Sequence, residues 1–420
     1  MPEIEITAMT FGPYGVGRLD GKTVMAPNCV PGDRLEVAIE SERRDYLLAR
    51  PIAVIRPGPD RRTPPCPFLP RCGGCDWQAI AYPAQVRLKG EIIAAELGRA
   101  LGVTLDPARL VEPAPAEFGY RSRIRLKAGP GGKLGFNQLG SNRLVEIDRC
   151  MVAAEGIRLP DRLAAALGRN LDTIEVVCEA ARNGGREVLI AHLMRPPAVI
   201  DLARAREVIA ADSAIAGIVM RSGRTREVIG DPAITIELEP ALQITVDADL
   251  FSQVNHVQNR RLIAFVMEAA GAHEAARILD LFCGAGNFSL PAARRGAEVT
   301  GVDSEPLAVA AAAANARRMG FDRARFSAMK ATETAAFLLR ARYRPATVIL
   351  DPPRAGAPDL MDPIAKLGAR AVIYVSCNLT TLARDLRALA ARGYRLENLR
   401  AFDFFPNTHH AEIVARAVLT

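Results

Sequence analysis

The sequence predicts an α/β protein that is built from three successive parts. Short β-rich runs broken by glycine and proline fill residues 1–58, which is the pattern of a small barrel. The middle span, residues 59–250, mixes one clear helix with many candidate strands. From residue 251 to 420, apolar strand-like runs alternate with helices, which is the pattern of a parallel, doubly wound sheet.

The first part shows β-rich runs separated by turn residues. The runs cover residues 3–7, 23–26, 34–39 and 46–55. Glycines at 12, 15, 17, 21 and 32 and prolines at 13 and 31 break them, and this spacing favours a barrel of five strands.

The middle part begins after a proline-rich linker. Residues 56–70 contain six prolines and three arginines, so this stretch cannot continue a sheet and marks a domain boundary. A helix is expected over about residues 82–101, and short strands follow it. This mixture predicts an α+β domain.

In the third part helices and strands alternate. Helices are expected over 262–270, 289–295 and 306–319, and strands over 277–282, 298–303, 347–351 and 371–376. The strand-like runs 395–404 and 411–419 then follow each other with no helix between them. Antiparallel strands need no crossover helix, so these runs predict a hairpin at the edge of the sheet.

The composition indicates the cellular compartment of the protein and the kind of partner that it binds. The chain of 420 residues has a formal net charge of +7, and only 6 of its 54 basic residues are lysine. An arginine excess suits phosphate and base recognition, and it also arises from a genome-wide bias toward arginine. No apolar stretch is long enough to span a membrane and no secretory signal is evident, so a cytosolic protein is expected. Clustered cysteines are then expected to hold metal or to do chemistry rather than to form disulfides.

A glycine-bearing loop follows the strand expected at 277–282. Gly284 and Gly286 let the backbone pass close to a ligand at a helix N-terminus. Asp303 ends the next expected strand, where a carboxylate accepts hydrogen bonds from both ribose hydroxyls of a nucleoside. The third glycine of the dinucleotide pattern is missing, which suits S-adenosylmethionine because this cofactor has no pyrophosphate. Asp280 is placed to face the sulfonium cation of this cofactor. The alternative interpretation is an ordinary glycine-bearing turn, which any α/β protein can contain.

Two further strand ends carry residues that suit catalysis. Asp351 opens Asp-Pro-Pro-Arg, in which rigid prolines fix the loop at the cleft. Cys377 ends the next strand, where a helix N-terminus and nearby arginine would lower its pKa and favour the thiolate. Carbon 5 of uracil becomes nucleophilic only after a thiolate adds at carbon 6, and a base must then remove the carbon 5 proton. Glu412 is the candidate base; taken singly, Cys377 also fits a buried small residue and Glu412 a charged strand end.

Four segments resemble the motifs of the RNA uracil-5 methyltransferases. They cover residues 280–287, 350–356, 374–385 and 404–412. The resemblance implies a Rossmann-like S-adenosylmethionine methyltransferase domain over 251–420, with Cys377 as nucleophile and Glu412 as base. It also implies that the cofactor and uracil pocket is lined by Gln253, Phe282, Asn287, Asp303 and Asp351. One departure is Met329-Lys330, where relatives often place Asn or Asp near the adenine.

A group of cysteines points to a metal centre. Cys66, Cys72 and Cys75 have the spacing C-x5-C-x2-C, and Cys150 follows in Asp-Arg-Cys. Three thiolates so close in sequence suit one metal centre, but the spacing does not decide between zinc and iron–sulfur. The ribosomal RNA members of the family carry a four-cysteine [4Fe–4S] cluster in this arrangement. The resemblance therefore implies such a cluster, with a structural role or a place in the RNA surface rather than radical chemistry.

Several features suit RNA as the partner. The N-terminal barrel resembles a TRAM domain, an OB-like module of RNA-modifying enzymes. Arg121, Arg123, Arg125 and Lys127 alternate with uncharged residues, so one face of that expected strand is basic and suited to phosphates. Its alternative is a solvated strand face. Phe251, Phe404 and Phe405 are candidates to stack on an unstacked base, or else core residues.

The favoured hypothesis is methylation of carbon 5 of a uridine in 23S ribosomal RNA, with no obligate protein partner. A transfer-RNA substrate and a non-catalytic RNA-binding assembly factor are the alternatives. A cytosine-5 methyltransferase is disfavoured because such enzymes have Asp-Pro-Cys where this chain has Asp-Pro-Pro. An exocyclic-amine methyltransferase is disfavoured because an aromatic residue is then expected at Arg354.

Overall fold

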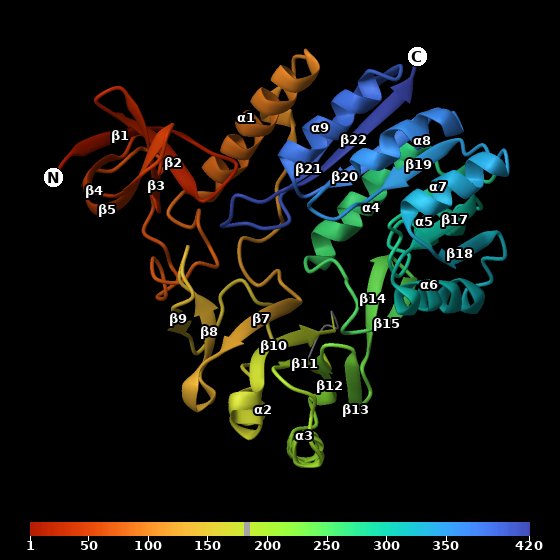
Figure 1. Ribbon diagram of the computed structural model, residues 1–420, viewed down its shortest axis with the longest axis horizontal. Helices are drawn as coiled ribbons and strands as arrows, with labels where there is room; N and C mark the ends of the chain where they lie inside the picture. Colours follow the sequence, from red (N-terminus) through yellow and green to blue (C-terminus); the bar gives the residue numbers. More distant parts are fainter. Residues whose placement is uncertain (180–184) are drawn as a thin grey trace. The chain divides into compact units, whose positions relative to one another are not determined.

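A computed structural model describes residues 1–179 and 185–420 of the chain (Figure 1). The described residues divide into two compact units. The smaller unit consists of Met1–Glu117, Asn137–Val145 and Arg400–Glu412. The larger unit consists of Phe118–Phe136, Glu146–Leu399 and Ile413–Thr420. Each unit is therefore assembled from segments that lie far apart in the sequence.

The first five strands close into a barrel in the order β1-β2-β3-β5-β4, as predicted. Their bounds are β1 Glu3–Met9, β2 Tyr14–Leu19, β3 Lys22–Pro27, β4 Arg34–Glu42 and β5 Tyr46–Arg56. Alternate side chains point inward, and Ile4, Ile6, Val24, Leu35 and Val37 belong to the buried core.

The strand β2 has no clear signal in the sequence because two glycines interrupt it. A Cβ atom at Gly15 would lie 2.4 Å from Sγ of Cys29, and one at Gly17 would lie 2.5 Å from the backbone oxygen of Glu5. Glycine is needed here because another backbone or side chain approaches closely, and not because the chain turns.

The segment after the barrel is irregular but ordered by a buried carboxylate. Asp33 accepts hydrogen bonds from the backbone N–H groups of Val30 and Gly58, at 2.7 and 2.8 Å. It also forms two bonds with the guanidinium of Arg61, at 2.8 and 2.7 Å. These bonds fix the start of the proline-rich linker against the barrel.

The predicted helix of the smaller unit is α1, Tyr82–Leu101. A proline lies in its first turn, and the helix ends at Gly102, whose φ of 68° is left-handed. The short elements η1, Pro107–Arg109, and β6, Val111–Glu112, follow it. β6 pairs in parallel with Ala401 and Phe402 at the end of β21.

A mixed sheet, most of which belongs to the larger unit, has the strand order β13-β12-β11-β10-β7-β8-β9. The bounds in this region are β7 Arg123–Ala128, η2 Pro130–Gly132, β8 Leu134–Asn137, β9 Leu144–Glu146, α2 Asp161–Leu167, η3 Gly168–Asn170, β10 Leu171–Cys178, β11 Glu187–Leu193, α3 Val199–Ala211, β12 Ile215–Ser222 and β13 Thr225–Gly230. β11 and β12 pair in parallel, and α3 is the crossover between them. A separate hairpin follows, β14 Ala233–Glu239 and β15 Leu242–Asp247.

The third part forms the predicted parallel sheet, with the order β18-β17-β16-β19-β20-β22-β21. The elements are α4 His256–Ala270, β16 Arg277–Leu281, α5 Ser289–Arg294, β17 Glu298–Asp303, α6 Pro306–Arg318, β18 Ala324–Ala328, α7 Ala331–Arg340, β19 Thr347–Leu350, η4 Pro358–Leu360, α8 Met361–Leu367, β20 Ala371–Ser376, α9 Leu379–Ala390, β21 Tyr394–Phe402 and β22 Glu412–Leu419. β16 to β20 are parallel, and β22 is antiparallel to β20. β22 and β21 are neighbours at one side of the sheet, and the short β6 pairs beyond β21, so the hairpin predicted at the edge is not the outermost part of the sheet.

Some elements of this third part differ from the sequence prediction. β18 has no predicted counterpart because it is an edge strand that is mostly exposed. α4 begins earlier than predicted, at His256, because Asn255 caps it by accepting the Gln258 N–H at 3.1 Å.

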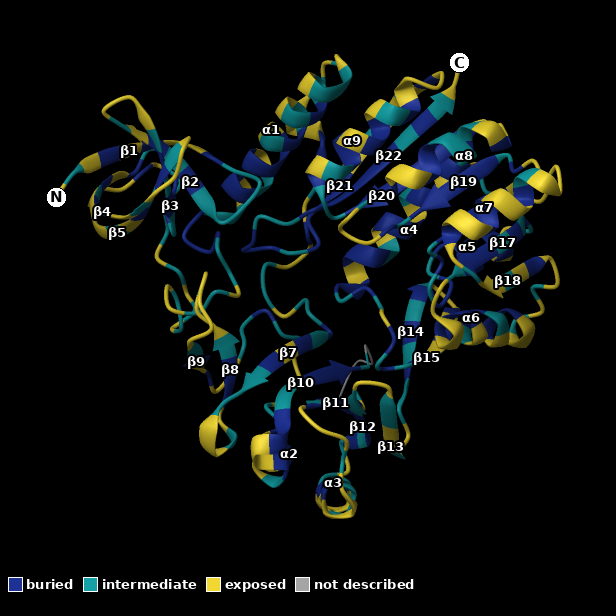
Figure 2. Cartoon of the chain, viewed as in Figure 1, coloured by how far each residue is buried: buried dark blue, intermediate teal, exposed yellow. Residues whose placement is uncertain are grey.

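The central strands β16, β19 and β20 are nearly all buried, as Figure 2 shows for β19 and β20. Strands covered on both faces read as continuous apolar runs, which is why the sequence predicts them well. Among the described residues, no helix has the length and apolar character needed to traverse a bilayer.

Candidate active site

Four neighbouring strands of the larger unit end at residues predicted to bind or react. β16 ends just before Phe282, and β17 ends at Asp303. β19 ends just before Asp351, and β20 ends just before Cys377. These strands are adjacent in the order β17-β16-β19-β20 and run in parallel, so their carboxyl ends meet at one rim. Ligands of open α/β sheets bind outside this edge.

The loop after β16 adopts a backbone conformation that is rare for L-residues. Phe282 has a φ of 68°, and Gly284 and Gly286 have φ values of 52° and 97°. Such a φ at a bulky residue marks local strain, which concentrates at ligand sites. The N–H of Gly284 donates to Oδ2 of Asp303 at 2.9 Å, and this bond joins the loop to the end of β17. Each oxygen of Asp303 keeps acceptor capacity for a hydroxyl.

The helix α4 supports the same loop from the side. Asn287 exchanges two hydrogen bonds with Asn259 of α4, at 2.8 and 3.2 Å. Gln253 is 9% exposed and lies two residues before Asn255, the N-cap of α4. The helix therefore connects the segment of Gln253 with the loop of Asn287. Nothing in the sequence distinguishes Asn259 from other polar helix residues.

Acidic side chains gather at this rim. Oδ2 of the fully buried Asp280 accepts a hydrogen bond from Oγ of Ser289 at 2.5 Å, and Oδ1 has no partner among the described residues. Burial raises the pKa of Asp280 to about 7, although the hydrogen bond from Ser289 lowers it. The negative charges of Asp351 and Asp303 raise this pKa further. Burial also raises the pKa of Asp351 to about 7. A cation at this rim would relieve these charges.

The loop after β19 is fastened by the helix α9. Asp385, fully buried, accepts hydrogen bonds from the hydroxyl of Tyr374 at 2.6 Å and from the N–H of Ala357 at 2.8 Å. Burial and the Asp385 carboxylate raise the pKa of Tyr374. The neighbouring Arg384 donates to Asp385 at 2.8 Å and to the carbonyl of Ala355 at 2.9 Å. The Asp-Pro-Pro-Arg loop is thereby tied to the helix that follows Cys377.

Cys377 is partly buried between a strand and a helix. It follows Ser376, the last residue of β20, and precedes Asn378, the N-cap of α9. Oδ1 of Asn378 accepts N–H bonds from the first turn of α9, and its Nδ2 donates to the carbonyl of Arg354 at 3.1 Å. The thiol therefore sits at a helix N-terminus, where the positive end of the helix dipole favours a thiolate.

Glu412 begins β22 and is 6% exposed. Its neighbour Ile413 is paired with Ser376 in the antiparallel ladder of β20 and β22. Cys377 is thus the residue after one member of this pair, and Glu412 is the residue before the other. The sequence alone does not show this relation between Cys377 and Glu412, because the two residues are far apart in the chain. It follows from the pairing of β20 and β22.

The aromatic residues considered for stacking have different environments. Phe404 is fully buried, which favours the core alternative over stacking. Phe251 is 74% exposed and follows the buried Leu250. Phe405 is partly buried and lies 6.1 Å from Phe404 between ring centroids.

The departure at Met329-Lys330 lies at the end of β18. The N–H of Met329 donates to the carbonyl of Asp303 at 2.9 Å, which places this segment next to the end of β17. The Lys330 side chain is 74% exposed and forms an ion pair with Glu333 at 3.8 Å. The Lys330 side chain has no acceptor atom, so the contact to the adenine stays unassigned.

The cysteines expected to hold a cluster are partly buried. Sγ of Cys72 accepts the N–H of Gly74 at 3.4 Å, and Oε1 of Gln78 accepts the N–H of Cys66 at 2.9 Å. Cys66, Cys72 and Cys75 belong to the smaller unit, whereas Cys150 belongs to the larger one. Within residues 1–179 and 185–420, no three His, Cys, Asp or Glu side chains form a group able to hold a metal ion.

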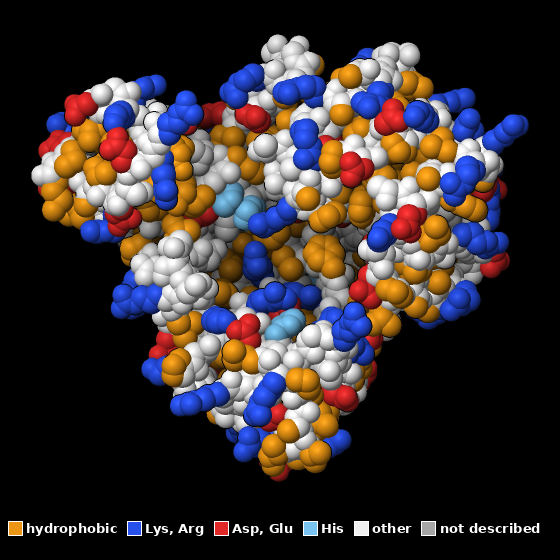
Figure 3. Space-filling model, viewed as in Figure 1, with side chains coloured by type: hydrophobic (Ala, Val, Ile, Leu, Met, Phe, Trp, Pro, Cys, Tyr) orange, Lys and Arg blue, Asp and Glu red, His pale blue; other side chains and the backbone are white. Residues whose placement is uncertain are grey.

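The predicted basic strand face is largely neutralised in β7. Arg125 forms an ion pair with Glu175 of β10, and Arg123 lies 3.5 Å from the same carboxylate. Lys127 forms an ion pair with Asp172. The interpretation as a phosphate track is weakened, because the neighbouring strand supplies the opposite charges that the sequence of β7 alone does not reveal. In Figure 3, Lys and Arg side chains are likewise interspersed with acidic ones.

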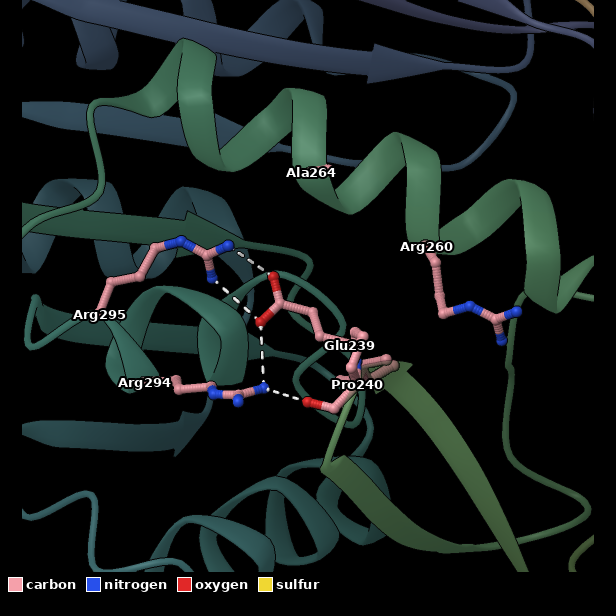
Figure 4. A pocket seen from close by; sticks show the side chains of 7 residues that line it. Glu239, Pro240, Arg260, Ala264, Arg294 and Arg295 are labelled. Atoms are coloured by element: carbon pink, nitrogen blue, oxygen red, sulfur yellow. Dashed lines mark hydrogen bonds and ion pairs between the residues drawn. The ribbon is translucent and has the colours of Figure 1, made fainter.

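A pocket of about 530 Å³ in the larger unit is separate from these residues (Figure 4). It is lined by Leu238, Glu239, Pro240, Arg260, Ala264, Arg294 and Arg295. Arg295 forms two bonds with Glu239, at 2.7 and 3.1 Å, and Arg294 donates to the carbonyl of Pro240 at 2.7 Å. These bonds fasten the β14–β15 hairpin to the end of α5, so the arginines here have a structural role.

Comparison with known proteins shows to which family the chain is similar. The model of the tRNA (uracil-5-)-methyltransferase family matches residues 217–416. The 23S rRNA (uracil(1939)-C(5))-methyltransferase RlmD of Alkalilimnicola ehrlichii is 34% identical over 432 residues, which cover 98% of this chain and 95% of the relative. RlmD of Thiobacillus denitrificans is 33% identical, with 99% of both chains covered.

A solved structure is similar over the same length. The tRNA (uracil-54, C5)-methyltransferase of Pyrococcus abyssi, in complex with S-adenosyl-L-homocysteine, matches with a TM-score of 0.77 and 25% identity. The match covers 99% of this chain and 100% of that chain. The parallel sheet is therefore the Rossmann-like domain of S-adenosylmethionine-dependent methyltransferases. The chain belongs to the family of S-adenosylmethionine-dependent RNA uracil-5 methyltransferases.

Proposed function

We propose that this protein transfers the methyl group of S-adenosylmethionine to carbon 5 of a uridine in 23S ribosomal RNA. The observation that carries the proposal is the single rim where the glycine-bearing loop, Asp303, Asp351 and Cys377 end adjacent parallel strands. The choice of ribosomal RNA is supported by the RlmD relatives, which match over nearly their whole length.

In the proposed reaction, the thiolate of Cys377 adds to carbon 6 of the uracil and forms a carbon–sulfur bond. The electron pair displaced onto the ring makes carbon 5 nucleophilic, and carbon 5 attacks the methyl group of the sulfonium. The bond between this methyl group and sulfur breaks, and S-adenosylhomocysteine leaves with the electron pair. Glu412 then removes the proton from carbon 5. The electrons of that bond restore the double bond between carbons 5 and 6, the carbon–sulfur bond breaks, and the thiolate leaves.

The cofactor contacts are proposed from the same rim. Asp303 would accept the ribose hydroxyls, since it stands at the end of β17 beside the loop. Phe282 and Asn287 would contact the nucleoside from that loop, and Gln253 would contact it from the segment before α4. Asp351, whose loop is tied to α9, would bind polar atoms of the uracil next to the nucleophile.

The domain roles follow the predicted boundaries of 1–58, 59–250 and 251–420. The closed five-strand barrel is proposed to be a TRAM-like module that binds single-stranded RNA. Because its substrate would be ribosomal RNA, the protein is expected to act in the cytosol. No obligate protein partner is invoked.

We further propose that Cys66, Cys72, Cys75 and Cys150 bind a [4Fe–4S] cluster. Four thiolates are a suitable ligand set, and the amide hydrogen bond to Sγ of Cys72 is of the kind that stabilises such centres. Metal binding of this kind couples to folding, so the centre would assemble on metal binding. Anaerobically purified protein is expected to contain four iron and four sulfide per chain, and Cys72→Ser to lose them; iron-free wild-type protein would contradict the proposal.

Transfer RNA is the second candidate substrate, because the Pyrococcus abyssi transfer-RNA enzyme matches nearly the whole chain. The test incubates the protein with labelled S-adenosylmethionine and either unmodified 23S or transfer RNA, followed by mapping of the labelled nucleoside. We expect 5-methyluridine in 23S RNA. Label in transfer RNA alone would overturn the substrate. Absence of label, with RNA binding unchanged in Cys377→Ala, would instead favour an RNA-binding assembly factor.

A further inference from the structure

The chain that leads into Glu412 is anchored by residues next to the cysteines of the smaller unit. Asp76, which follows Cys75, accepts a hydrogen bond from the backbone N–H of His409 at 3.0 Å. Its second oxygen lies 2.5 Å from Nδ1 of the same histidine. The two side chains are only 10% and 16% exposed. One carboxylate thus fixes both the backbone and the ring of His409, three residues before Glu412.

A second anchor lies two residues earlier. Asn407 is fully buried and has a left-handed φ of 68°. Its N–H donates to Oε1 of Gln85 at 2.7 Å, and its carbonyl accepts the N–H of Trp77 at 3.0 Å. Its side-chain oxygen accepts a hydrogen bond from Arg62 at 2.7 Å. The turn at 407 is therefore held from residues 62, 77 and 85.

The segment 403–411 is consequently fixed to residues 62–89 along most of its length. Its first residue, Asp403, forms an ion pair with Lys89 at 2.7 Å, and both side chains have no exposed area. If this segment only had to be packed, apolar contacts would be sufficient, because they do not require charged groups to lose their water. Polar contacts specify one position of a backbone, which a catalytic residue on that backbone requires.

We propose that the Asp76–His409 pair positions Glu412 for removal of the carbon 5 proton. The inference rests on the proposed function, in which Glu412 acts only after the methyl transfer. The nucleophile and the cofactor loop belong to other segments, so loss of the pair should slow release of the product and spare formation of the adduct. A displacement of about 1 Å in a reacting group is enough to cost a rate factor of about 100.

The test is a single-turnover reaction with substrate RNA and labelled S-adenosylmethionine. It follows the covalent protein–RNA adduct on denaturing gels and the released 5-methyluridine. Asp76→Asn and His409→Gln are each expected to slow release about 10- to 100-fold while the adduct forms at the wild-type rate and accumulates. The double variant should be no slower than either single one, because both remove the same contact.

Two controls separate this inference from the function on which it rests. His273→Gln, at an exposed histidine outside the proposed site, should release product as the wild type does. Glu412→Gln should accumulate adduct. If Asp76→Asn lowers adduct and product together, or changes neither, the positioning role is wrong while the function stands. If wild-type protein forms no 5-methyluridine, or Cys377→Ala still forms it, the proposed function itself fails.

Discussion

Two aspartates at the carboxyl ends of neighbouring strands have raised pKa values, and this has a functional consequence. Desolvation raises the pKa of Asp280, which is fully buried, and of Asp351, which is partly buried, to about 7. Near neutral pH each aspartate is therefore neutral in part of the molecules and ionised in the rest. A sulfonium cation at this rim favours the ionised forms, so binding of S-adenosylmethionine should release protons.

The affinity for S-adenosylmethionine is accordingly expected to rise at least about tenfold between pH 5.5 and 7.5, because the ionised fraction of a group with a pKa near 7 rises over this range. Titration calorimetry at several pH values measures it. S-adenosylhomocysteine is the matched ligand, since its sulfur is uncharged, and its affinity should vary less. An equal pH dependence for both ligands would show that the carboxylates do not face the sulfonium.

At the scale of single residues, the sequence predicts those residues whose chemistry is tied to a strand end. Asp303, Asp351 and Cys377 are predicted because the strand before each is an apolar run with a clear end. Residues that position these groups are not predicted. The Asp76–His409 contact joins residues far apart in sequence, and no local pattern indicates such a pair.

Between elements, the helix α9 holds the loop that carries Asp351. Replacing Asp385 by Asn keeps the side-chain volume but removes the charge that accepts hydrogen bonds from Tyr374 and Arg384. We expect the free energy of unfolding to fall by about 1–3 kcal/mol, together with a loss of methylation. Asp362→Asn, in an exposed pair with Lys366, is the matched control and should change neither. Urea denaturation and a methylation assay measure both quantities; equal effects of the two variants would contradict the assignment.

The buried ion pair between α1 and the segment after β21 allows a second test at this scale. Lys89→Met would leave the carboxylate of Asp403 buried without its cation, which typically costs about 3–5 kcal/mol. The double variant with Asp403→Leu should recover much of this loss, because no buried charge remains. A double variant as unstable as Lys89→Met would show that packing, not charge, dominates; denaturant unfolding of all three proteins decides it.

Helices and strands are predicted where the local sequence pattern is strong. They are missed where contacts with a neighbouring element determine the structure. The buried strands β16, β19 and β20 and the helix α1 are predicted. β2 is missed because its glycines are needed where other parts of the chain approach its backbone closely. The charge of β7 is misjudged because acidic residues of β10 neutralise it. In each case the deciding atoms belong to another element.

In the whole molecule, the chain passes repeatedly between the two units. The proposed nucleophile belongs to the larger unit, and the proposed base ends the last segment of the smaller one. Sequence patterns report local structure and not which distant segments pack together, so this exchange of segments is not visible in the sequence. Residues 400–412 in particular pack in the unit that contains the barrel and α1.

The most direct test of the account uses substrate RNA in which the target uridine is replaced by 5-fluorouridine. A base cannot remove fluorine as it removes a proton, so the methylated adduct should persist. After protease and nuclease digestion, mass spectrometry is predicted to find one methylated fluorouridine attached to the peptide that contains Cys377. Methyl transfer with no adduct, or an adduct on another residue, would contradict the central claim that Cys377 is the covalent nucleophile.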